Sequence, residues 1–127
     1  MYMWQVKLFG FDSTDALAKD LGTMKMKEII MLIQFPPDYP FNPPFVRILR
    51  PRFQFMTGHV TVGGSICMEL LTRTGWSPQN TVEAVIMSIR SELIAGGGRL
   101  DKHNRTDYSE AEARDAYQRL LQKHGWQ

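Results

Sequence analysis

One apolar run limits the folds that this chain of 127 residues can adopt. From Ile29 to Phe35 every side chain except Gln34 is apolar, and Pro36-Pro37 follow directly. A short apolar run of this kind is typical of a strand that is buried on both faces of a sheet. Proline ends such a strand because it has no backbone N–H to donate. The run therefore predicts a central strand that stops at the two prolines.

Two other segments supply neighbours for this strand. Residues 4–8 place an apolar side chain at every second position, and residues 45–50 alternate in the same way around Arg47. A period of two is typical of a half-buried strand. Residues 12–22 are polar and break the pattern, so we expect a connection there. Three neighbouring strands with short connections favour an antiparallel meander.

Beyond residue 80 the apolar period becomes that of a helix. Asn80 can cap a first helix, with Glu83 at the third position of a capping box. Gly96-Gly97-Gly98 would end this helix. Its apolar stripe consists of Val82, Val85, Ile86, Ile89 and Leu93.

A second helix is predicted over residues 110–124. Ser109 and Glu112 form a second capping box, and Gly125 would stop the helix. We assign its apolar stripe to the core: Ala113, Ala116, Tyr117, Leu120 and Leu121.

Strands followed by helices indicate an α+β fold in a single domain, residues 1–127. We expect a four-stranded antiparallel meander sheet with the C-terminal helices packed on one side. The fourth strand would lie within residues 52–62, at about 53–56.

Composition excludes several classes of partner. The net charge is +2 and the basic residues are scattered, so nucleic acid is not expected as a partner. No apolar stretch approaches the roughly 20 residues of a membrane span, so no membrane partner is expected either. A single cysteine without a secretory signal indicates the cytoplasm or the nucleus.

Cys67 is the cysteine in question, and alone it can form neither an internal disulfide nor a cysteine metal site. It is therefore a buried structural thiol or a nucleophile. It lies within residues 51–77, a long segment with little regular period, and such a segment in a small domain is usually functional. This context favours a nucleophile.

The motifs around Cys67 resemble those of a known family. Tyr39-Pro40-Phe41-x-Pro43-Pro44, then Gly64-x-Ile66-Cys67, then Trp76-Ser77-Pro78 before a helix is similar to the core of ubiquitin-conjugating enzymes. The run from Ile66 to Thr72 and the ending His124-Gly125-Trp126 are most similar to the divergent Q-type branch. The resemblance extends over nearly the whole chain.

The resemblance implies acyl transfer through Cys67, with ubiquitin, its activating enzyme, a ligase and a protein substrate as partners. Cys67 would accept the C-terminal glycine of ubiquitin as a thioester and yield it to an acceptor amine or to a ligase cysteine. No metal and no bound cofactor would be needed, because ATP is consumed upstream. We expect Phe41 to be an exposed anchor and Tyr39 to pack on the sheet. The ligase-binding residues that the resemblance implies are Pro40, Phe41, Ser77, Pro78 and Gln79.

The chain departs from the family pattern at three places. The usual N-terminal helix is missing before the first strand. His59 stands eight residues before Cys67, where most members carry Asn. The usual gate residue falls near Leu100, and the nearest carboxylate is Asp101.

His59 and Asp101 are therefore candidate catalytic residues beside Cys67. The imidazole could donate to an oxyanion or brace the loop, and it could also be a loop histidine without a chemical role. Asp101 could help to deprotonate the acceptor amine, or it could be a solvated loop carboxylate.

Other functions stay open at this point. The same fold could be an inactive module that binds ubiquitin or a ligase, or an enzyme for another ubiquitin-like modifier. A thiol redox protein is a weak alternative, since there is no second cysteine to resolve an intermediate.

Overall fold

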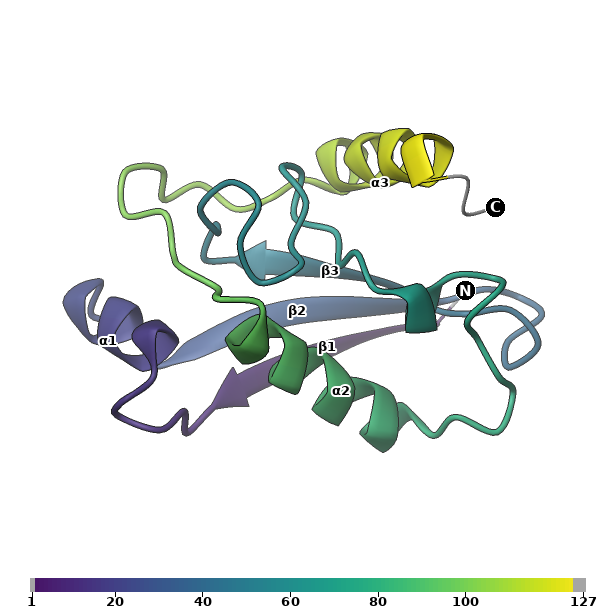
Figure 1. The fold of residues 1–127 in the computed structure, drawn as a ribbon, viewed down its shortest axis with the longest axis horizontal. Coiled ribbons are helices and arrows are strands. Elements are labelled where there is room, and N and C mark those ends of the chain that lie inside the picture. Colours follow the sequence, from purple (N-terminus) through teal and green to yellow (C-terminus); the bar gives the residue numbers. More distant parts are fainter. Residues whose placement is uncertain (1, 125–127) are drawn as a thin grey trace.

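Three antiparallel strands form the centre of the molecule, and helices flank them (Figure 1). The structure, a computed structural model, describes residues 2–124. The sheet order is β1-β2-β3, so the strands run as the predicted meander. The elements are β1 (Tyr2–Phe9), α1 (Ala16–Thr23), β2 (Glu28–Phe35), β3 (Phe45–Arg50), the short 3₁₀ helix η1 (Glu69–Leu71), α2 (Val82–Ala95) and α3 (Glu110–His124).

β2 is the central strand, and both of its faces are buried. Its odd-numbered residues from Ile29 to Phe35 belong to the main core, while Ile30 and Leu32 are buried on the opposite face. Pairing with β1 and β3 occupies both edges of the strand. The apolar run was therefore interpreted correctly, because a strand between two others needs apolar side chains on both faces.

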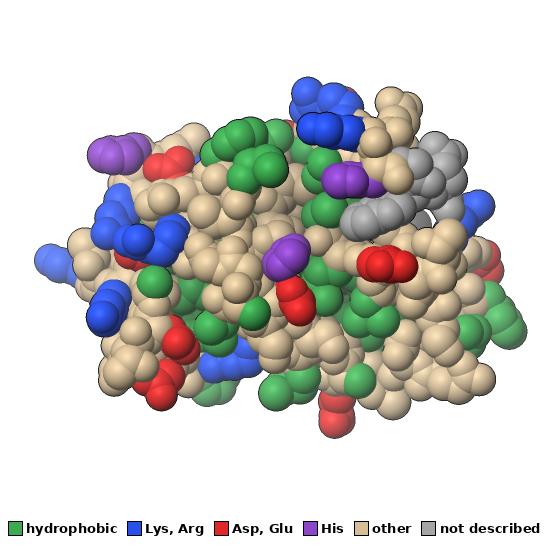
Figure 2. Space-filling model, in the orientation of Figure 1, with side chains coloured by type: hydrophobic (Ala, Val, Ile, Leu, Met, Phe, Trp, Pro, Cys, Tyr) green, Lys and Arg blue, Asp and Glu red, His purple; other side chains and the backbone are tan. Residues whose placement is uncertain are grey.

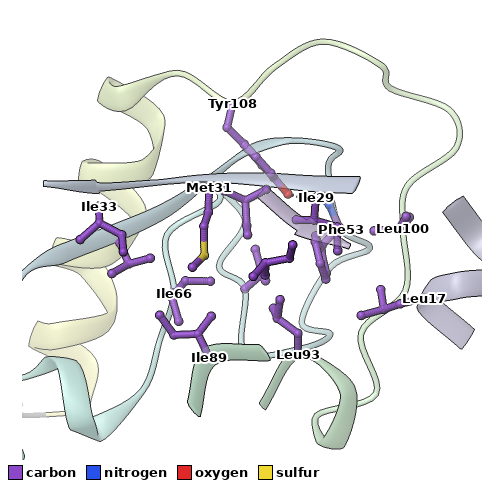
Figure 3. Packing of buried hydrophobic residues seen from close by; sticks show 14 of the residues in the cluster. Leu17, Ile29, Met31, Ile33, Phe53, Ile66, Ile89, Leu93, Leu100 and Tyr108 are labelled. Carbon is purple, nitrogen blue, oxygen red and sulfur yellow. Dashed lines mark hydrogen bonds between the residues drawn. The ribbon is translucent and has the colours of Figure 1, made fainter. Parts of the chain in front are cut away.

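α2 covers the core face of the sheet. Figure 3 shows Ile89 and Leu93 of α2 pointing toward Ile29 and Met31 of β2. None of these four side chains is more than 1% exposed. The helix ends at Gly96, its C-cap, as the three glycines predict. No helix within residues 2–124 is long and apolar enough to cross a membrane.

α2 begins one residue later than predicted. Thr81 is the N-cap, and its side-chain oxygen accepts a hydrogen bond from the Ala84 N–H at 3.1 Å. Asn80 instead donates its backbone N–H to the Ser77 carbonyl at 3.0 Å. The predicted Asn80 cap was wrong because both residues are good caps and the preceding turn engages Asn80.

Residues 16–23 form helix α1, so the connection predicted for residues 12–22 was wrong in its second half. Leu17 and Leu21 are one helical turn apart, and both are buried in the main core. Asp20 is also buried, and it pairs with Arg99 from a distant segment. A stripe of two leucines is too narrow to predict a helix, and tertiary contacts complete it.

The predicted fourth strand is absent from the part of the chain that the structure describes. Phe53 makes one isolated bridge with Leu100, and its backbone N–H donates to the Tyr108 hydroxyl at 2.8 Å. Val60 makes a second isolated bridge with Ile66. These loop and side-chain partners take the place of a strand ladder, so the segment is buried without being a strand.

α3 has the predicted bounds but not the predicted position. Ser109 and Glu112 form the expected capping box: the Glu112 carboxylate accepts from the Ser109 N–H at 2.9 Å, and the Ser109 hydroxyl accepts from the Glu112 N–H at 3.2 Å. Arg114, however, donates to the Gln34 side chain at 2.9 Å, and Gln34 alternates with the core residues of β2. The two long helices therefore do not share one face of the sheet. The predicted stop at Gly125 lies outside the described residues.

Asp20 fastens α1 to the segment that follows α2. Its carboxylate accepts hydrogen bonds from Arg99 Nε at 2.8 Å and from the Leu100 N–H at 3.0 Å, and Lys102 Nζ lies 3.3 Å away. The Arg99 guanidinium, supported by these other two groups, lowers the pKa of Asp20 to about 2, although burial opposes the shift. The carboxylate is therefore buried in its charged form.

We predict that Asp20→Asn lowers the free energy of unfolding by about 2 kcal/mol near neutral pH. Because the folded-state pKa is depressed, this stabilisation is present above the unfolded pKa of about 3.9. It is lost as the pH falls to about 2. Urea unfolding across this range measures the effect, and the two proteins should converge at acid pH. A constant difference at every pH would contradict this assignment.

Candidate functional site

Backbone hydrogen bonds to β3 fix the segment that carries Cys67. The Ile48 N–H donates to the Gly64 carbonyl at 2.8 Å, and the Ile66 N–H donates to the Val46 carbonyl at 3.0 Å. These two bonds form an isolated antiparallel bridge at the outer edge of β3. Residues 64–66 therefore continue the sheet by one short segment, and Cys67 comes directly after it.

The loop before Cys67 pairs with the other edge of this segment. The Thr61 N–H donates to the Ser65 carbonyl at 2.9 Å, and the Cys67 N–H donates to the His59 carbonyl at 2.7 Å. The hydroxyls of Thr61 and Ser65 are buried and lie 2.7 Å apart. The Cys67 N–H is thus already engaged within the protein, and it is not free to stabilise an oxyanion.

Two glycines let α3 approach this segment closely. A Cβ atom on Gly63 would lie 2.0 Å from the Glu112 carbonyl oxygen, and one on Gly64 would lie 2.5 Å from the Tyr108 ring. Gly64 also has a φ of +94°, which other residues rarely adopt. The first turn of α3 and the residue before it therefore rest directly on the backbone of the Cys67 loop.

Cys67 is half-buried and lines a cleft of about 490 Å³. The loop around His59 and the end of α2 form one side of the cleft, and α3 forms the other with Ala116, Leu120 and Lys123. Burial raises the pKa of the Cys67 thiol. The free sulfur is therefore held mainly as the neutral thiol at physiological pH.

Exposed apolar side chains stand at the rim of this cleft. Phe55, Met56 and Val62 line it and are 73%, 76% and 58% exposed. Figure 2 shows that hydrophobic side chains on this face gather in separate groups and not in one continuous patch. The rim is thus a local apolar surface beside the thiol.

Tyr117 packs close to Cys67. Its hydroxyl donates to the Leu71 carbonyl at 3.2 Å. Burial, and to a lesser degree the charge of a Cys67 thiolate, raise the pKa of Tyr117 to about 12. Tyr117 therefore stays neutral beside the sulfur. The helical period assigned Tyr117 and Leu120 to the core, but both are only half-buried, and Leu120 lines the Cys67 cleft.

His59 lines the same cleft as Cys67. Its Nε2 atom lies 2.9 Å from Oε2 of Glu92, near the end of α2. The ring rests on Gly96, because a Cβ there would come within 2.6 Å of His59 Cδ2. Sequence reasoning identified His59 but missed Glu92, since nothing in the helical pattern distinguishes that carboxylate from its neighbours.

Asp101 is not among the residues that line the cleft. Its Oδ1 atom accepts hydrogen bonds from the backbone N–H groups of His103 and Asn104 at 2.9 and 3.4 Å. Leu100, where the family gate would fall, is fully buried. The structure therefore brings His59 to the site of Cys67 and places Asp101 in a surface turn.

The two loops predicted to bind a ligase are joined to each other. Trp76 Nε1 donates to the Pro40 carbonyl at 2.7 Å. Tyr39 packs between Phe35 and Trp76, with ring centroids 4.8 and 6.0 Å away, whereas Phe41 is 75% exposed. The expectations for Tyr39 and Phe41 are both met in geometry.

The second loop adds polar groups beside this aromatic pair. Pro78 and Gln79 are exposed, and the Ser77 hydroxyl donates to the Gln79 side chain. Pro40, Phe41 and this loop therefore form one continuous surface. Within residues 2–124 no cluster of three or more His, Cys, Asp and Glu side chains could hold a metal ion.

Comparison with known proteins identifies the family. A family profile described as "Ubiquitin-conjugating enzyme" matches residues 22–123. The chain is 41% identical over 134 residues to the ubiquitin-conjugating enzyme E2 Q1 of Homo sapiens, and 37% identical over 132 residues to the Q-like protein 1 of the same enzyme class and species. It is 35% identical over 131 residues to the Q-like protein CG4502 of Drosophila melanogaster.

These matches cover different shares of the relatives. Each includes 99% of this chain, but only 31% of E2 Q1 and 42% of CG4502, against 81% of the human Q-like protein 1. The chain thus spans about a third of the length of the E2 Q1 relatives, and it corresponds to most of the shorter Q-like protein 1.

We predict that Gly63→Ala destabilises the fold by about 1–3 kcal/mol, because the new methyl group would overlap the backbone of α3. Gly22→Ala is the matched control. Gly22 lies in α1, and a Cβ there would meet no atom within 4 Å, so the change should be neutral or slightly stabilising. Urea unfolding of both variants decides the question, and equal stability would exclude close packing of α3 on residue 63.

Proposed function

Since this chain belongs to the ubiquitin-conjugating enzyme family, we propose that it carries ubiquitin as a thioester on Cys67 and transfers it to an acceptor amine or to a ligase. The observation that carries the proposal is the position of Cys67, anchored to the sheet and half-exposed at a cleft. A rigidly held nucleophile beside an open groove suits transfer between large protein partners. The proposed partners are ubiquitin, its activating enzyme, a ligase and a protein substrate.

Loading would be an exchange between two thioesters. The Cys67 sulfur attacks the carbonyl carbon that joins ubiquitin to the activating enzyme; a new S–C bond forms, and the old one breaks. No cofactor bound to this chain is needed, because ATP is consumed upstream. The cleft, with Leu120 on one side and the apolar rim of Phe55 and Met56, would hold the extended C-terminal tail of ubiquitin.

Transfer requires stabilisation of a tetrahedral oxyanion. The Cys67 N–H cannot supply it, because that group donates to the His59 carbonyl. His59 is the candidate in the cleft for a role in transfer. Asp101 would assist only an acceptor that approaches over the turn at residues 101–104, so we assign it a secondary role.

The surface formed by Phe41 and the Ser77–Gln79 loop would bind a ligase. The Trp76–Pro40 hydrogen bond holds the two loops in one arrangement without a partner. A preordered surface with an exposed aromatic residue is the kind that interfaces use as an anchor. A single domain, spanning the whole chain, would then combine the thiol and the ligase surface.

We predict that the chain forms a ubiquitin adduct when it is incubated with the activating enzyme, ubiquitin and ATP. The adduct should disappear with a reducing thiol and should be absent from Cys67→Ala. Cys67→Ser should instead form an oxyester that resists the thiol, since oxygen replaces sulfur as the nucleophile. Non-reducing gel electrophoresis separates these outcomes. Failure of the wild-type chain to form any adduct would favour an inactive binding module.

Phe41→Ala should leave loading of Cys67 within about twofold but slow ligase-stimulated discharge by about tenfold, the effect of losing an aromatic anchor. Phe9→Ala is the matched control, because Phe9 is also exposed, at 66%, and lies at the end of β1. Single-turnover discharge with and without a ligase measures both. Equal rates for the two variants would remove Phe41 from the ligase surface.

A further inference from the structure

Glu92 and His59 form a pair at the Cys67 cleft that the family motifs do not include. Nε2 of His59 lies 2.9 Å from Oε2 of Glu92, and both side chains are 43% exposed. The His59 backbone is held independently, because its carbonyl accepts the Cys67 N–H at 2.7 Å. Contact with Gly96 limits the ring further. The imidazole is therefore restrained from α2 and from the Cys67 segment at once.

Both members of the pair occupy locally unfavourable positions. His59 has a φ of +62°, in the left-handed region that non-glycine residues usually avoid. Glu92 lies near the C-terminus of α2, where the helix dipole disfavours a negative charge, and the last turn contains no basic residue. Two exceptions to local preference that meet in one contact are expected where a site has a function.

The contact determines which nitrogen of a neutral His59 carries the proton. A carboxylate only accepts, so Nε2 must be the N–H that donates to Glu92. Nδ1 is then an unprotonated acceptor. It lies across the ring from the Cδ2 atom that rests on Gly96, and among the described residues no side chain or backbone group makes a hydrogen bond to it.

We propose that Glu92 is a positioning residue that makes His59 the proton acceptor for the attacking group during transfer from Cys67. This inference rests on the proposed function. It assigns His59 a role different from donation to the oxyanion, which a neutral ring bonded to Glu92 through Nε2–H cannot perform with Nδ1.

Transfer then conserves atoms and charge. The acceptor nitrogen attacks the thioester carbonyl, an N–C bond forms, and His59 Nδ1 takes the proton that the nitrogen loses. Glu92 stabilises the resulting imidazolium through Nε2–H. The S–C bond then breaks, Cys67 leaves as a thiolate, and the proton on His59 passes to it. The neutral ring is restored, with no oxidant or cofactor.

The test compares loading with discharge. The chain is loaded with ubiquitin, the activating enzyme is stopped, and free lysine is added as the acceptor. Glu92→Gln should load within about twofold of wild type but discharge about tenfold to a hundredfold more slowly, and His59→Ala should be at least as slow. The double variant should be no slower than His59→Ala, because the two residues act as a unit.

Glu83→Gln is the matched control, since it removes a carboxylate from the first turn of the same helix. Nitrogen NMR of the unloaded chain reads the His59 tautomer directly, and the Nε2–H form should predominate in wild type and decline in Glu92→Ala. A predominant Nδ1–H form, or discharge by Glu92→Gln as fast as by Glu83→Gln, would overturn the proposal. If the wild type does not load at all, the proposed function fails, and the tautomer still decides whether Glu92 orients His59.

Discussion

Four backbone hydrogen bonds, two on each side of residues 64–66, determine where the thiol lies. On one side they join this short segment to β3, and on the other they join it to residues 59–61. Cys67 follows a piece of backbone that is nearly as well fixed as the sheet itself. The same bonds place His59 beside the cleft, since its carbonyl is one of the four acceptors.

The rest of the site depends on how closely helices can approach that segment. Gly63 and Gly64 have no side chains, so α3 and Tyr108 pack on the backbone and close one wall of the cleft. The opposite wall comes from the end of α2. Asp20 holds the segment directly after α2 through Arg99 and Leu100, so an ion pair remote from the thiol supports the position of that wall.

Local sequence was sufficient where one element carried its own signal. The apolar run of β2 and the Ser109–Glu112 capping box of α3 each determine an element without help from elsewhere in the chain. α1 could not be predicted in this way, because Asp20 is buried only by virtue of Arg99, 79 residues away. Glu92 was missed for the same reason: its significance depends on His59, which only the folded chain brings near. Cys67 and Phe41 were found because their neighbours in sequence are also their neighbours in space.

The partial burial of Cys67 bears on which chemical form of the sulfur the site tolerates best. Removal from water raises the pKa of the thiol because it disfavours a localised negative charge. An acylated sulfur carries no charge, so the same environment does not oppose it. Hydrogen peroxide reacts with the anion, and a site that keeps the anion scarce protects its sulfur between turnovers. The pocket is thus better matched to the occupied carrier than to the bare ion.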